Sequence, residues 1–371
     1  MPVDGKNNWA KTRITELLKI QYPIFQGPFG RGGSTPLLAA TVSNAGGLGG
    51  YGGNDLSPEE LTSVISEIRA LTDKPFNINL WVSTFDEGGE RLDASKHRPL
   101  IELLTPYYRE LGVEPAVFAD STPYAPRNFE EQVDALIEAK PAVFSFVFGV
   151  PSDEILRRCR SEGILTAGAA STVDEAKLLE EAGVDIVVAS GFEAGGHHSA
   201  FLRSEEESQI GTFALVPQIA DAVKVPVVAA GGIADGRGIA AALTLGADAA
   251  QIGTAFLACD ESGATDAHRQ LLFKENARTT VLTRAFTGRL ARGVHNKFAS
   301  EMKRHEKEFA PYPAHNWIIA PLRAAALAQG RLDLVGLWAG QAARLSRHHK
   351  TDELFAALVQ DTNKIYENRT L

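Results

Sequence analysis

Cysteine and long apolar runs are scarce in this chain of 371 residues. Its two cysteines, Cys159 and Cys259, cannot form a disulfide framework, and this fits a reducing compartment. No run of about 18 apolar residues could span a membrane, and residues 1–20 lack the apolar core of a signal peptide. We therefore expect a cytoplasmic globular protein without a membrane partner.

Blocks of basic charge and several catalytic motifs are also missing. The 37 Lys and Arg residues are outnumbered by 46 Asp and Glu residues, which gives a net charge of −9. With no isolated basic cluster, a nucleic-acid partner is not expected. The chain contains no HExxH, paired CxxC, GxxxxGKS, GxxxxGKT or GxSxG pattern, which argues against metal, P-loop and α/β-hydrolase chemistry. No residue is therefore predicted to bind a metal.

The sequence does contain a regular alternation of short apolar runs and amphipathic segments. Most of the apolar runs lack period-two alternation, as expected of strands that are buried on both faces of a parallel sheet. Eight βα units in succession predict an α/β protein with a (β/α)8 TIM barrel, and a doubly wound open sheet is the less favoured alternative. The predicted strands are Pro23–Gln26, Gly47–Gly50, Phe76–Trp81, Ala142–Phe148, Ile164–Ala167, Asp185–Ala189, Pro226–Ala230 and Ala249–Ile252.

Several predicted helices have recognisable first residues. Ser57 with Glu60 has the spacing of a capping box, and Thr172 with Glu175 repeats it. Asp235 is placed to cap a further helix. Towards the C-terminus, helical patterns are predicted near Ala264–Thr280, Trp317–Ala328, Leu334–Leu345 and Asp352–Tyr366.

Two segments interrupt or follow the predicted barrel, which would occupy residues 14–258. Residues 82–141 separate the third and fourth strands, and insertions of this length are commonly lids or binding loops. If this insertion leaves the carboxyl end of the third strand, we expect it over the barrel mouth. Residues 259–371 are expected to form a mainly helical extension that packs on the barrel.

A glycine-rich pattern lies near the end of the predicted barrel. Gly231 and Gly232 follow the seventh strand, and Gln251-Ile-Gly-Thr254 ends the eighth. In TIM barrels a phosphate commonly binds between these two loops, where glycine lets backbone N–H groups approach an anion and a hydroxyl such as that of Thr254 can donate. The alternative is that these glycines only form tight turns. We favour a phosphate site.

The segment Gly191-Phe-Glu-Ala-Gly-Gly-His-His198 follows the sixth strand, where TIM barrels place catalytic side chains. Two glycines before His197 would let its imidazole approach a flat ligand, and histidine is suited to proton transfer near neutral pH. We expect His197 to be functional and His198 to be an exposed loop residue. A phosphate pocket without a metal or a nucleophile motif indicates a phosphate-bearing cofactor that supplies the reactivity.

Polar residues also occur at the first and third strands. Gln26-Gly-Pro-Phe-Gly30 follows the first strand, and Asn77 and Asn79 lie on the same side of the third. A buried asparagine needs partners, which could be a ligand or the neighbouring loops. The residues alone leave that choice open.

Together these motifs resemble the nitronate monooxygenase family, formerly called 2-nitropropane dioxygenases. The resemblance covers roughly 14–298 and returns in Leu337-Trp-Ala-Gly-Gln341, and its most specific element is Glu193-Ala-Gly-Gly-His197. Thr287-Gly-Arg-Leu-Ala-Arg-Gly293 also resembles the family's segment after the barrel. The resemblance implies an FMN-dependent TIM barrel that oxidises alkyl nitronates with O₂ to carbonyl compounds and nitrite. Neutral nitroalkanes are an open further substrate class.

Carried over by position, the resemblance makes His197 the catalytic base. The residues implied in cofactor binding are Gln26, Gly27, Pro28, Asn79, Ser190, Gly195, Gly231, Gly232, Gln251, Ile252, Gly253 and Thr254. Ser190 stands where the family often has glutamine, so one flavin contact would be shortened or lost.

The Glu-Ala-Gly-Gly-His pattern is also similar to flavin-dependent enoyl-acyl-carrier-protein reductases and to NAD(P)H:quinone reductases. Those enzymes need a nicotinamide to reduce the flavin, whereas a nitronate supplies its own electrons. The alternative function is therefore an NAD(P)H-dependent reductase of quinones or enoyl thioesters on the same barrel. A flavin-binding barrel without turnover is a further alternative, and the sequence leaves monomer or homodimer open.

Overall fold

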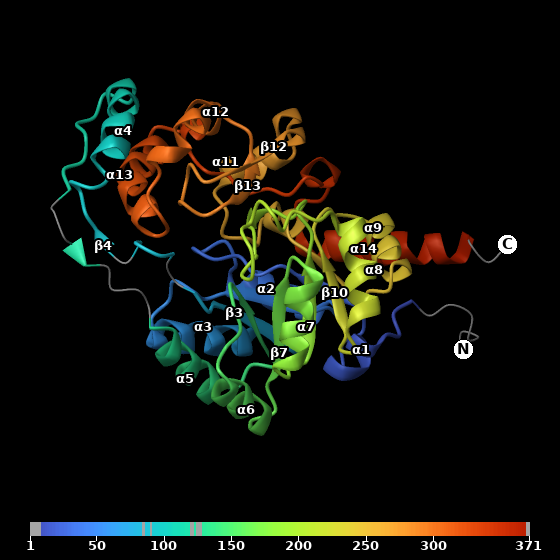
Figure 1. The fold of residues 1–371 in the computed structure, drawn as a ribbon. Coiled ribbons are helices and arrows are strands. Elements are labelled where there is room, and N and C mark those ends of the chain that lie inside the picture. Colours follow the sequence, from blue (N-terminus) through green and yellow to red (C-terminus); the bar gives the residue numbers. More distant parts are fainter. Residues whose placement is uncertain (1–8, 84–85, 90, 119–121, 124–127, 369–371) are drawn as a thin grey trace.

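Eight parallel strands form a closed barrel in the computed structural model, which describes residues 9–83, 86–89, 91–118, 122–123 and 128–368 (Figure 1). From the second barrel strand to the eighth, each strand pairs with the next along the chain, and the eighth pairs with the first. A bridge between Phe25 and Leu48 joins the first strand to the second and completes the ring. The TIM barrel prediction is confirmed. The barrel strands are β1 (Ile24–Gln26), β2 (Gly49–Gly52), β3 (Phe76–Trp81), β6 (Val143–Val147), β7 (Leu165–Ala170), β8 (Ile186–Ser190), β10 (Val227–Ala230) and β11 (Ala249–Ile252).

Helices surround this barrel because their apolar faces pack on strands that are buried on both sides. The capping boxes predicted at Ser57 and Thr172 are present, and Asp235 caps its helix through the N–H groups of Arg237 and Gly238. The helices are α1 (Arg13–Leu18), α2 (Pro36–Asn44), α3 (Pro58–Leu71), α5 (Phe129–Ala139), α6 (Asp153–Ser161), α7 (Val173–Glu181), α8 (Thr212–Ala222), α9 (Gly236–Thr244) and α10 (Thr254–Leu257).

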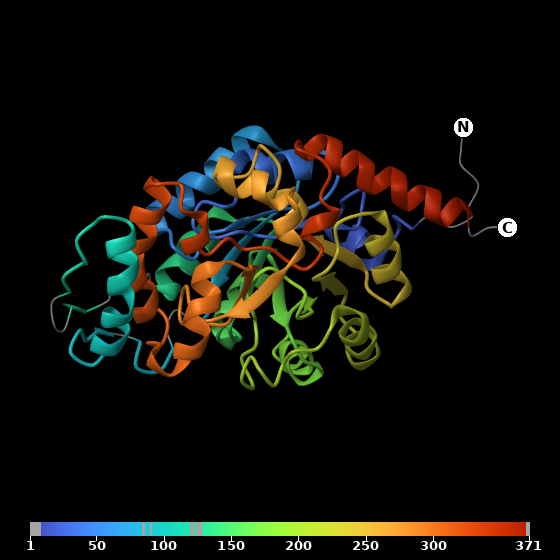
Figure 2. The ribbon, with the colours of Figure 1, turned by 90° about the horizontal axis from the view of Figure 1, so that it is seen from above.

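The C-terminal helix α14 (Thr351–Asn368) returns to the barrel and packs against α9 and α2 (Figure 2). Leu354, Phe355 and Leu358 on this helix are buried in the same apolar cluster as the barrel core. The helix predicted over 352–366 is therefore present, and it supplies outer-layer packing to the barrel from the far end of the chain.

Described parts of the segment between β3 and α5 pack against the chain between α10 and α14, outside the ring of barrel helices (Figure 1). α4 (Arg98–Glu110) contacts α13 (Ala314–Ala328), and the two helices share a second apolar cluster. The remaining elements are β4 (Arg91–Leu92), β5 (Thr122–Pro123), β9 (Gly196–His197), α11 (Asp266–Leu272), β12 (Thr280–Thr283), β13 (Ala291–Val294), α12 (Lys297–Met302) and the 3-10 helices η1 (Glu275–Arg278), η2 (Lys303–Glu308), η3 (Leu332–Leu334) and η4 (Ala343–Leu345).

The helix predicted over 334–345 is wrong, because this stretch bonds to other parts of the fold. The N–H of Val294 donates to Leu337 at 2.8 Å, and the N–H of Gln341 donates to Glu193 at 2.9 Å. Gly340 donates to the Thr254 hydroxyl at 2.9 Å. These tertiary hydrogen bonds use backbone groups that a helix would need, and they outweigh local propensity.

Among the described residues, no helix has the length and apolar character to cross a membrane.

Candidate active site

A cavity of about 460 Å³ opens at the carboxyl ends of the barrel strands. Side chains of the C-terminal segment, such as Trp338, close its upper side. The described residues of 83–141 do not line it. The structure gathers most of the predicted site residues in its wall: Gly27, Pro28, Asn79, Ser190, Gly195, His197, Gly231, Gly232, Gln251, Gly253 and Thr254.

Gln26 and Ile252 do not line the cavity. Both side chains are buried, at 1% and 0% exposure. The Gln26 amide bonds instead to the backbone of Gly27 and Gly50, and the Ile252 carbonyl accepts from the Gly27 N–H at 2.9 Å. These two residues therefore hold the backbone of the β1 loop in place beneath the cavity.

The loops after β10 and β11 form a concave group of backbone donors. Gly231 and Gly232 have φ values of 107° and 72°, a region that side chains rarely adopt. Within the described chain, no protein acceptor lies within hydrogen-bonding distance of the N–H groups of Gly232 and Gly253. The Thr254 hydroxyl accepts from Gly340 and keeps its own hydrogen for a ligand. This arrangement suits an anion with several oxygens.

Small residues form the floor of the cavity. Ala167 and Ala169 on β7, with Val188 on β8 and Ala230 on β10, line it from below. Asn79 is 6% exposed and donates from Nδ2 to the Ser145 hydroxyl at 2.9 Å. A flat ring could therefore lie over the barrel axis, with the Asn79 amide at its edge. Asn77, which lies on the same side of β3, does not line the cavity.

His197 is positioned by pairing between the loop after β8 and the C-terminal segment. Its short strand β9 pairs with β13, so that His197 lies opposite Ala291. The N–H of His198 donates to the Leu290 carbonyl at 2.9 Å. His198 is 6% exposed, so the expectation of an exposed loop residue is wrong, because its ring bonds to the Ser208 carbonyl at 3.2 Å.

Aromatic rings surround the His197 imidazole. The ring centroids of Trp81 and Trp338 lie 5.1 and 5.4 Å from that of His197. This enclosure partly buries the imidazole, which disfavours its charged form, and the positive charges of Arg289 and Arg31 add to the effect. Together they lower the pKa of His197 to about 3. The imidazole is therefore neutral near pH 7 and able to accept a proton.

Thr287 bonds to one ring nitrogen of His197. Its Oγ1 lies 3.0 Å from Nε2 and 3.2 Å from the Arg289 carbonyl, which can only accept. A hydroxyl has one hydrogen, so donation to Arg289 requires Nε2 of His197 to carry the proton. Nδ1 is then the nitrogen with the free lone pair.

A family model and a related sequence both indicate the family of this chain. The model of the nitronate monooxygenase family matches residues 11–361. A probable nitronate monooxygenase from Staphylococcus aureus strain Newman is 37% identical over 360 residues, which span 97% of this chain and 99% of the relative. The chain belongs to the nitronate monooxygenase family.

Solved structures agree with this family assignment. A nitroalkane oxidase from Streptomyces ansochromogenes is 36% identical, with a TM-score of 0.84, and the match covers 96% of this chain and 99% of that one. FabK from Thermotoga maritima is 31% identical, with a TM-score of 0.75, and the match covers 97% and 98%. As a nitronate monooxygenase family member, the protein is a flavin-dependent oxidoreductase.

The cavity fits the flavin that this family uses. The free N–H groups of Gly232 and Gly253 can hold a phosphate, and the small residues on the floor leave room for the ring system. A side chain built on Gly253 would meet only the Phe29 ring, at 3.8 Å, and would project into this space. The same loops therefore provide both the donors and the room that a flavin phosphate needs.

The sequence did not single out several residues around His197. Trp81 and Trp338 line the cavity, while Arg289 is 3% exposed and stacks on Phe148 with 4.3 Å between its guanidinium carbon and the ring centroid. For Arg289 and Trp338 the only signal was the resemblance of 287–293 and 337–341 to family segments. These two residues are about 90 and about 140 residues from His197 and Trp81 is on another strand, so local patterns could not place them beside His197.

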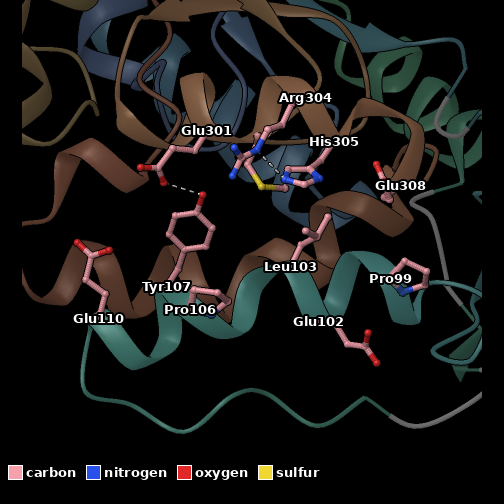
Figure 3. A pocket seen from close by; sticks show the side chains of 11 residues that line it. Pro99, Glu102, Leu103, Pro106, Tyr107, Glu110, Glu301, Arg304, His305 and Glu308 are labelled. Atoms are coloured by element: carbon pink, nitrogen blue, oxygen red, sulfur yellow. Dashed lines mark hydrogen bonds between the residues drawn. The ribbon is translucent and has the colours of Figure 1, made fainter.

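A second hollow, of about 640 Å³, lies between α4 and the α12–η2 segment, outside the barrel (Figure 3). Tyr107 points across it and donates to Glu301 at 2.9 Å. Its wall includes Glu102 and Glu308 but none of the predicted site residues. We therefore place the active site at the barrel mouth.

Proposed function

We propose that the protein is an FMN-dependent nitronate monooxygenase that oxidises alkyl nitronates with O₂ to carbonyl compounds and nitrite. The observation that carries this proposal is the charge of the cavity around His197. The described chain places Arg31 and Arg323 in the cavity wall and no Asp or Glu, although the whole protein has a net charge of −9. The similarity to a nitroalkane oxidase supports the same chemistry.

Such a cavity favours an anionic substrate over a neutral one. A unit negative charge about 8 Å from one guanidinium group gains about 2 kcal/mol when the effective dielectric constant is about 20. A nitronate carries this charge, whereas its parent nitroalkane does not. The neutral imidazole of His197 adds no charge, so this preference comes from the arginines in the cavity wall.

The lowered pKa of His197 favours the same substrate. General bases work best when their pKa lies near the working pH, and a value of about 3 makes His197 a weak acceptor for a carbon-bound proton. We therefore expect kcat/KM for a preformed nitronate to exceed that for the neutral nitroalkane by about 100-fold or more. Nitrite release from both forms of one compound, assayed before they interconvert, measures this ratio. Equal values would contradict the proposal.

The proposed cofactor is FMN, because the free N–H groups of Gly232 and Gly253 form a donor group of the kind that a single phosphate needs. When bound, the flavin accepts electrons from the substrate and passes them to O₂. We expect the purified protein to be yellow and to release FMN on denaturation. Mass spectrometry of the released chromophore checks this, and finding FAD or a colourless protein would contradict it.

The similarity to FabK supports the reductase as the alternative function. The decisive experiment mixes the flavin-loaded protein anaerobically with NADH and, separately, with a nitronate, and follows flavin bleaching. We expect rapid bleaching by the nitronate and nitrite release when O₂ is admitted. Efficient bleaching by NADH alone, with no nitrite from any nitronate, would transfer the assignment to the reductase.

A further inference from the structure

Two arginines from distant parts of the sequence meet on one amide at the edge of the cavity. Arg31 follows β1 and Arg323 lies in α13, and each donates from Nη1 to Oδ1 of Asn316 at 3.0 Å. Asn316 is 6% exposed, Arg323 is half-buried and Arg31 is exposed. Both arginines line the cavity that contains His197. A ligand in this cavity can therefore reach both guanidinium groups.

The one carboxylate bonded to this pair within the described ranges is that of Asp55, which accepts from the backbone N–H of Arg31 at 3.3 Å and not from a guanidinium group. Neither guanidinium forms an ion pair there, and burial together with the like charge of Arg31 lowers the pKa of Arg323 to about 10. Arg284, which is also partly buried, instead pairs with Glu205 and Glu206, both at 2.8 Å. Two like charges held together without an anion are costly, so a bound anion would stabilise the pair.

We propose that Arg31 and Arg323 form a subsite for an oxyanion group at the end of the ligand remote from the reacting carbon. The identity of that reacting end rests on the proposed function. Planar guanidinium groups bind carboxylate and phosphate through paired N–H donors, and Asn316 uses only one nitrogen of each arginine. Two ligands share this chemistry: a nitronate with a terminal carboxylate, and a nicotinamide nucleotide with its phosphates.

The backbone at Arg31 supports a ligand role. Its φ is 52°, in the left-handed region that residues other than glycine rarely adopt. The neighbouring residues 30, 32 and 33 are glycines. Residues held in such conformations cluster at ligand sites. The same feature provides a well-tolerated variant, because Arg31→Gly removes the charge and suits the observed φ.

The kinetic test compares two nitronates of equal chain length, those of 1-nitropentane and of 5-nitropentanoate. In Arg31→Gly and Arg323→Met we expect the preference for the carboxylate, measured as the ratio of the two kcat/KM values, to fall by about 10- to 100-fold, mainly through KM. Arg109→Met, an exposed arginine on α4, removes the same charge away from the cavity and should keep the wild-type ratio. Equal losses on both nitronates would overturn the subsite.

A binding test needs no turnover. Glutarate and inorganic phosphate are titrated into the flavin-loaded protein and followed by flavin absorbance, and we expect Arg323→Met to weaken binding of at least one anion by about tenfold or more. Anion binding that is absent, or that does not depend on either arginine, would overturn the subsite. If binding depends on the arginines but no nitronate yields nitrite, the subsite stands and the proposed function fails.

The two sources of the oxyanion are separated by anaerobic flavin reduction. If the subsite holds nucleotide phosphate, both arginine variants should slow reduction by NADPH more than reduction by NADH. If it holds the carboxylate of a nitronate, the loss should be larger for the nitronate of 5-nitropentanoate than for that of 1-nitropentane, and NADH and NADPH should be affected equally.

Discussion

At His197, burial and positive charge act in the same direction. Enclosure by aromatic rings disfavours the imidazolium ion, and Arg289 and Arg31 disfavour it further, so the pKa is about 3. The sequence predicted His197 because glycines and a strand end precede it. It did not predict the neighbours that set its protonation, since Thr287 and Arg289 reach the ring only through the pairing of β9 with β13. At the residue scale, the motif predicted His197 as a base but did not predict the neighbours that lower its pKa.

We predict that His197→Asn separates two substrate classes. A neutral nitroalkane must lose its Cα proton, and a positioned base contributes about 10²–10⁴-fold. Because the lowered pKa makes His197 a weak base, nitrite release from the nitroalkane should fall by an amount near the lower limit of that range, about 100-fold. A preformed nitronate has already lost that proton and should lose less than about tenfold. Initial rates on both forms of one compound measure the difference. Equal losses would show that His197 binds or orients the substrate, and unchanged rates would remove it from the site.

Among the elements, the barrel strands were predictable and the short strands were not. All eight barrel strands were predicted to within about three residues, because strands buried on both faces are continuous apolar runs. β9, β12 and β13 have two to four residues and no apolar pattern, yet they position the loop that carries His197. The insertion after β3 acts on this region through an ion pair: Asp86 contacts the buried Arg289 at 2.8 Å.

We predict that Asp86→Asn destabilises the protein by about 1–3 kcal/mol, because it leaves the buried Arg289 without its carboxylate. The lower part of that range is expected, since the Asp86 side chain is 38% exposed. Urea unfolding measures the loss. Arg289→Met removes the cation, so adding Asp86→Asn to that variant should cost much less. Additive losses in this double-mutant cycle would mean that the two side chains do not depend on each other.

Across the whole molecule, three buried histidines from different parts of the chain have lowered pKa values. Burial lowers the pKa of His97 from the insertion, His268 from α11 and His315 from α13, the last to about 4. His315 is fully buried and donates from Nε2 to the Ala285 carbonyl at 2.8 Å, while its Nδ1 has no partner in the described chain. The sequence showed nine histidines but not which would be buried, because burial depends on how the insertion, α13 and the barrel meet.

We therefore predict that the free energy of unfolding falls as the pH falls from 7 to 5. A histidine whose folded pKa lies below its unfolded value of about 6.5 binds fewer protons when folded, so acid favours the unfolded chain. Each such histidine contributes a slope of up to about 1.4 kcal/mol per pH unit between those two values.

The variant His315→Gln keeps a donor for the Ala285 carbonyl and removes the titration, so it should reduce this slope by up to that amount. His349→Gln, at an exposed position, should keep the wild-type slope. Urea unfolding at pH 7, 6 and 5 measures all three proteins. A constant free energy across this range, or equal slopes for His315→Gln and wild type, would show that His315 takes up protons equally well in the folded and unfolded chain.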